Sequence, residues 1–289
     1  MFLPTLSCLL LSTQLQSQVL SSYFLQISYS FIEQLNSLQL WHWSIFLSLF
    51  HPYQPFREQL VKSIINSHIG ECVKKDDLEG DLNTAQLILQ SIKENYYINI
   101  IENDLGISPI IVYEALSYYA HYEKMVLLEV TCQLSSNDYN GAFLNLIREI
   151  LPIAICKNDV GLIQMSLRLF ADHEKEVSLW REIGDVLEEY VNYLACVPQS
   201  EEDFVEGEDL LKAVENWSCF EEILKKENVE KMINEMAWRI IAQLVEYLKK
   251  QDSINWEHVQ FVLAQMQQLH LPFDIKKILY DSLQEIIPM

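Results

Sequence analysis

Apolar residues recur along most of this chain at spacings of three and four, the period of helices with one buried side. Phe24, Ile27 and Phe31 open the first clear stripe, which predicts a helix from about Ser22 to Leu38. Residues 96–105 could also form a short strand, but their position between helices favours a helix. The pattern therefore predicts an all-α protein. Further helices are expected over 6–20, 56–69, 83–93, 108–123, 125–134, 161–170, 179–194, 229–248, 256–269 and 273–287. Ser108, followed by Pro109, is expected to cap the helix over 108–123, and Asp159 the helix over 161–170.

One segment, Leu40–His51, is apolar on nearly every side of a helix. A helix of that kind is buried by its neighbours or lies in a membrane, and this one is shorter than the about 20 residues that cross a bilayer. We therefore expect a core helix packed between the helix before it and the helix after it. The structural core expected here consists of Phe31, Leu35, Leu40, Trp41, Trp43, Ile45, Phe46, Leu49, Leu60 and Ile64.

Short turns join the first helices, so neighbouring helices are expected to pack antiparallel. No TPR, ankyrin or leucine-rich period recurs, which favours an irregular α-solenoid over a consensus repeat. We expect a helical trunk-like stack over 1–196, an exposed acidic loop over 197–209 and a helical tail over 210–289. The loop is predicted because Pro198 and six acidic residues interrupt the apolar pattern there.

Charge argues against a nucleic-acid-binding protein, because the formal net charge is −21, from 41 acidic and 20 basic residues. The acidic excess is densest over 172–235, which is either a docking surface for a basic partner or a set of solvated helix faces. The six cysteines lie far apart and form no CxxC pair. Their helical surroundings predict reduced core thiols.

No pattern along the chain indicates chemistry. There is no GxSxG, Walker A or GxGxxG sequence, no HExxH, and no close pair of His and Cys. The Trp41-His42-Trp43 run could stack on a ligand, but aromatic residues at helical spacing are more often core. We expect no catalytic residue, no cofactor and no metal site, and a protein that is not an enzyme.

Met1–Leu20 has the leucines of a signal peptide but not its positive start, because the first Lys or Arg is Arg57. An amphipathic helix cut from a longer protein is the better interpretation. We expect no transmembrane segment.

The order of several helix motifs resembles a known family, the scaffold nucleoporins released from the 98/96 nucleoporin precursor. The likeness begins with a Gln-Leu helix, continues with a Leu-Trp-x-Trp-x-Ile-Phe helix that ends in His, and reaches an Arg-Glu pair. Further on it includes a Gly-x-Ser-Pro helix start, a Glu-Ala pair and a downstream Ala-His. The motifs are Phe31–Leu35, Leu40–His51, Arg57-Glu58, Leu105–Leu116, Ala120-His121 and Asn137–Ala142, within about Tyr23–Val197.

The resemblance implies the trunk and tail of an ancestral coatomer element, a helical stack that folds back on itself. It implies a structural subunit of the Y-shaped outer ring of the nuclear pore complex, located at the nuclear envelope. Such a subunit binds other helical nucleoporins and so supports pore assembly, mRNA export and protein transport between nucleus and cytoplasm.

In the family, the stretch that adds a blade to a β-propeller partner lies upstream of these motifs. That stretch is missing from this sequence, so we do not expect contact with the propeller partner. The alternative is an α-solenoid adaptor of a vesicle coat or another large assembly, which would use the same helix packing. The sequence assigns no residue to a particular partner.

Overall fold

All regular structure in the described part of the protein is helical, which confirms the all-α prediction. The computed structural model describes residues 18–51, 53–73, 82–195, 200–217, 227–251, 255–268 and 273–284. Contacts divide the chain into two compact units, Met1–Asp138 and Tyr139–Met289, so the division differs from the one expected near residue 197. Most of the helix expected over 6–20 lies outside the described residues.

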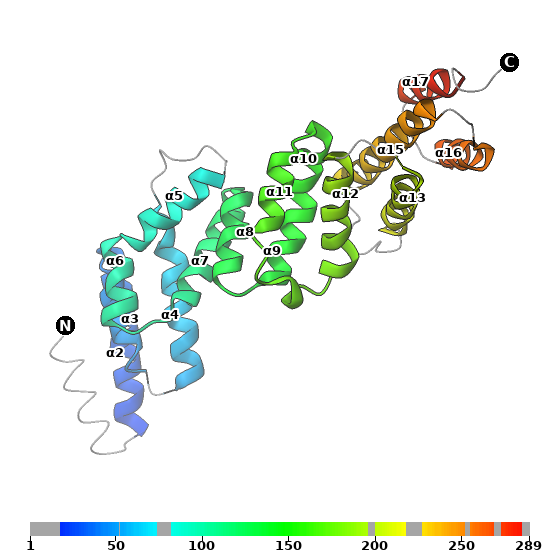
Figure 1. Ribbon diagram of the computed structural model, residues 1–289. Coiled ribbons are helices and arrows are strands. Elements are labelled where there is room, and N and C mark those ends of the chain that lie inside the picture. The colour runs from blue at the N-terminus through cyan, green and yellow to red at the C-terminus, as the bar shows by residue number, and fades with distance from the viewer. Residues whose placement is uncertain are drawn as a thin grey trace. The chain divides into compact units, whose positions relative to one another are not determined.

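The first unit is built around α3, which lies between α2 and α4 (Figure 1). The α4 helix packs in turn on α7, and α7 on α8. A left-handed residue, Gln39 with φ 60°, turns the chain from α2 into α3. The helices are α2 (Gln18–Ser37), α3 (Trp41–Ser48), α4 (Gln54–His68), α5 (Leu82–Lys93), α6 (Tyr96–Asn99), α7 (Pro109–Tyr122) and α8 (Val126–Ser135), with short turns η1 (Ile69–Cys72) and η3 (Ile100–Asp104).

Local signals set the start of α7 as the sequence predicts. Gly106 adopts φ 66° and separates η3 from the next helix. The Ser108 hydroxyl then accepts a hydrogen bond from the Ile110 amide at 3.4 Å, and Pro109 is the first helical residue. A hydroxyl cap followed by proline satisfies amides that have no partner inside the helix.

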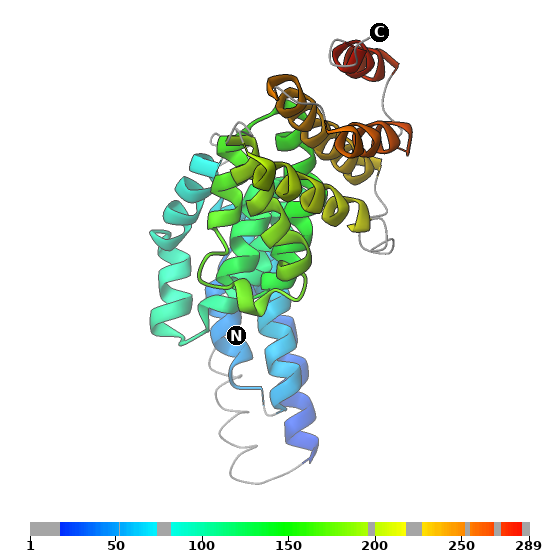
Figure 2. The same ribbon diagram turned by 45° about the vertical axis from the view of Figure 1, so that its right-hand side comes forward.

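The second unit is organised by α15, a 24-residue helix that contacts α10, α13, α16 and α17 (Figure 2). Its buried stripe includes Met236, Ile240 and Leu244. The Asp159 carboxylate caps α11 as predicted, accepting from the Leu162 amide at 3.0 Å. The helices are α9 (Tyr139–Asn145), α10 (Leu151–Lys157), α11 (Val160–Arg168), α12 (Asp185–Ala195), α13 (Glu201–Asn216), α15 (Glu227–Lys250), α16 (Trp256–Gln268) and α17 (Phe273–Gln284), with η4 (Leu146–Ile150), η5 (Glu174–Glu176) and η6 (Trp180–Gly184).

The prediction of an exposed acidic loop is wrong for residues 201–209, which lie in α13. The helix starts at a reciprocal cap: the Asp203 amide donates to the Ser200 hydroxyl at 3.2 Å, and the Ser200 amide donates to the Asp203 carboxylate at 2.8 Å. Phe204 and Leu211 are buried in this helix, whereas Glu202, Glu206 and Asp209 are exposed. Residues 197–199 are outside the described part.

Candidate interaction surface

The α3 helix has one side that holds the first unit together. Trp41 is 1% exposed and stacks on the imidazole of His68 in α4, with ring centroids 5.7 Å apart and planes at 5°. The buried Ser44 hydroxyl donates to the carbonyl of Ile32 in α2 at 3.3 Å. Because the Ser44 side chain is small and its hydroxyl is hydrogen-bonded to α2, the two helices can approach closely there.

The opposite side of α3 is apolar and exposed in the described part of the protein. Trp43 is 48% exposed and Leu40 is 38% exposed. They border a groove of about 300 Å³ between α2 and α3. No charged side chain lines the groove. Its lining consists of Phe31, Leu35, Leu40, Trp43, Phe46 and Leu47.

Aromatic contacts extend this groove along α3. The rings of Phe50 and Phe46 meet edge to face at 5.0 Å, and those of Phe46 and Trp43 meet at 5.8 Å. Edge-to-face pairs of this kind are favourable and fix the rings in place. We call the six groove residues together with Phe50 the α3 surface.

The ten residues expected in the core divide into three groups. Leu35, Trp41, Ile45 and Ile64 are buried, whereas Phe31, Phe46, Leu49 and Leu60 are half-buried. Leu40 and Trp43 are exposed, and placing them in the core was wrong. The reason is that the neighbouring helices leave one side of α3 uncovered, and a segment that is apolar all round does not indicate which side that is.

Charge is almost absent from this part of the molecule. Glu33 is the one acidic or basic residue before Arg57 in the sequence. Beside the α3 surface, burial lowers the pKa of the His42 imidazole, which keeps it neutral at neutral pH. Recognition at the α3 surface must therefore come from apolar contact rather than from ion pairs.

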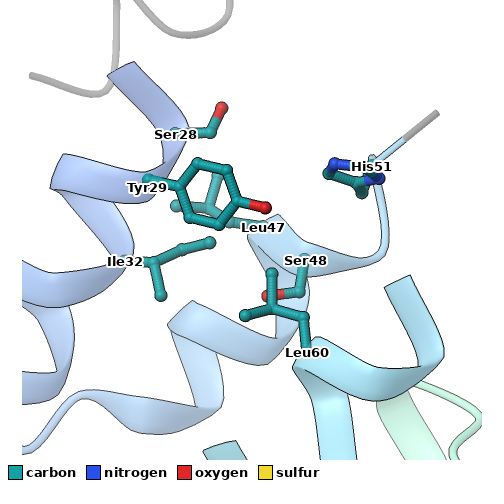
Figure 3. Close-up of a pocket in the computed structure, with 7 residues that line it drawn as sticks. All are labelled: Ser28, Tyr29, Ile32, Leu47, Ser48, His51 and Leu60. Atoms are coloured by element: carbon teal, nitrogen blue, oxygen red, sulfur yellow. The ribbon is translucent and has the colours of Figure 1, made fainter. Parts of the chain in front are cut away.

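A second, much smaller pocket lies between α2, α3 and α4. Figure 3 shows Ser28, Tyr29 and Ile32 of α2 facing Ser48 and His51 across it. Its volume is about 10 Å³, roughly the space that one water molecule needs. The buried Ser28 hydroxyl has no protein partner in the described structure, so a single water suits this pocket and an organic ligand does not.

Titratable groups in the described residues give no sign of a reactive site. Burial raises the pKa of the Cys72 thiol to about 12 and also raises that of Cys132. Both thiols are therefore protonated at neutral pH, which is the unreactive form.

In the described residues, no three His, Cys, Asp or Glu side chains converge as a metal site would require. None of the described helices is both long and apolar enough to cross a membrane.

The second unit has a mixed groove that the sequence did not predict. It lies between α15, the end of α12 and the turn after α10, around Asn158, Trp238 and Arg239. The Arg239 guanidinium donates to the Glu235 carboxylate at 2.8 and 2.6 Å and to the Asn158 side chain. Because its charge is already paired, this arginine ties α15 to the α10–α11 turn and is not available as an anion site.

The family described as Nuclear protein 96 matches residues 5–119 of the chain. This segment contains the α2–α4 helices and all of the α3 surface, and it amounts to less than half of the chain. The comparison with curated proteins gave no match.

Proposed function

We propose that the chain is a structural scaffold subunit of the outer ring of the nuclear pore complex, because residues 5–119 match the Nuclear protein 96 family. The family match is the observation that carries the proposal. In this role the chain binds other helical nucleoporins, supports pore assembly and so serves mRNA export and protein transport. The role is structural and not catalytic.

The helical construction of the chain supports this role. Stacked helices with short connections offer long outer faces on which other helices can pack ridge into groove. In the first unit, the core around Trp41 and Ile45 fixes α2, α3, α4 and α7 as one packed group. A rigid group of this kind can hold neighbours at fixed positions without any chemical step.

Co-purification tests the partner part of this proposal. The full chain, tagged and expressed in its own cells, is cross-linked and isolated, and bound proteins are identified by mass spectrometry. We expect outer-ring nucleoporins in stoichiometric amounts. Recovery of vesicle-coat subunits without nucleoporins would instead support the adaptor alternative.

A further inference from the structure

The α3 surface combines a projecting side chain and a groove on one face. Trp43 stands half-exposed at the border of the groove, and Phe31, Leu35 and Leu47 line it. Helices pack when a ridge of side chains on one enters a groove on the other. A face that carries both parts is complementary to itself across a two-fold axis, because each copy offers its ridge to the other copy's groove.

Electrostatics favours the same face for contact between copies. Each copy has a net charge of −21, so two copies repel each other where acidic side chains face one another. The α3 surface contains only apolar residues, and Glu33 is the one acidic or basic residue in the sequence before Arg57. Here two copies can approach without bringing like charges together.

We propose that the α3 surface is a self-association site, through which two copies of this chain form a two-fold symmetric dimer. The Trp43 indole of each copy enters the groove of the other. The inference goes beyond the proposed function and does not depend on it, since it requires only the chain itself. Seven side chains are fewer than the roughly 20–30 residues per side of a standard interface, so we expect a weak, reversible dimer.

Sedimentation velocity on the purified full chain, over a series of micromolar concentrations, tests this proposal. We expect a monomer–dimer equilibrium. Trp43→Asp should weaken it by at least about 100-fold, because tryptophan anchors dominate interfaces and the two-fold axis removes both at once. Leu40→Asp at the same border should also shift the chain to monomer. Added salt should strengthen the dimer, because it screens repulsion and leaves apolar contact intact.

Trp256→Asp is the matched control, since Trp256 is 50% exposed but lies in α16 of the second unit. It should leave the dimer unchanged, and circular dichroism of all three variants should match the parent chain. Four results would overturn the proposal: a parent chain that is monomeric throughout, a dimer that survives Trp43→Asp, a dimer that only Trp256→Asp removes, or an open-ended series of oligomers.

Discussion

Trp41 and Trp43 are two positions apart on α3 and have opposite surroundings. The first is buried against the His68 ring of α4 and the Tyr97 ring, whereas the second stands at the groove border. Side chains two apart on a helix point about 200° away from each other. One therefore belongs to the core and the other to the surface, although the sequence around them is equally apolar.

Truncating these two tryptophans should give unequal losses of stability. Trp41→Ala should cost about 3–5 kcal/mol, because it empties a fully enclosed site. Trp43→Ala should cost less than about 1 kcal/mol in the monomer, because its side chain is half in water already. Denaturant unfolding of dilute protein measures both, and equal losses would show that the two sides of α3 are not distinct.

The cysteines should react with a maleimide in an order that follows burial. Cys156 is exposed, whereas Cys72 and Cys132 are buried, and burial raises the thiol pKa of all three. At neutral pH we expect Cys156 to be labelled before Cys72 and Cys132, which should react only after unfolding, since a buried thiol is closed to the reagent and stays protonated. Mass spectrometry of the digested protein assigns each site. Rapid labelling of Cys132 in the folded chain would contradict its burial.

At the scale of the element, Gly207 shows how closely α13 packs on its neighbour α15. Glycine among acidic residues is typical of a turn, but Gly207 lies inside α13, where the Leu244 side chain of α15 comes close. A Cβ atom on this residue would lie 2.8 Å from Leu244 Cδ2 and would also meet the Tyr193 hydroxyl. The glycine therefore provides space for a neighbouring helix.

Two glycine substitutions separate helix propensity from packing. Gly207→Ala should lower stability, because the methyl group clashes with the buried Leu244 and Tyr193 side chains. Gly161→Ala, in the exposed first turn of α11, should instead raise it by up to about 1 kcal/mol. Thermal melts of both variants decide this. A gain at Gly207 would mean that α13 and α15 are not closely packed.

The positions of helices could be predicted from the sequence where capping residues and the spacing of apolar residues define them. The caps at Ser108 and Asp159 and the stripe of α15 were predicted because spacing and capping act within a few residues. The exposed side of α3 was not, because it depends on where α2 and α4 lie. The start of α13 was missed for a related reason, since the Ser200–Asp203 cap lies within an acidic run that resembles a loop.

At the scale of the whole chain, the family segment and the first compact unit nearly coincide. Residues 5–119 fall within Met1–Asp138, so the family match refers to one packed group of helices. The second unit is also all-helical among its described residues and carries 27 of the chain's 41 acidic residues. For both units, we propose other helical nucleoporins as partners.

Because we propose a scaffold role at the nuclear pore, imaging of the nuclear rim is the most direct test. The chain, tagged with a fluorescent protein and expressed at its natural level, should give a punctate rim around the nucleus that overlaps a known pore marker. A signal spread evenly through the cell, with no enrichment at the rim, would contradict the claim that the chain is a nuclear pore scaffold.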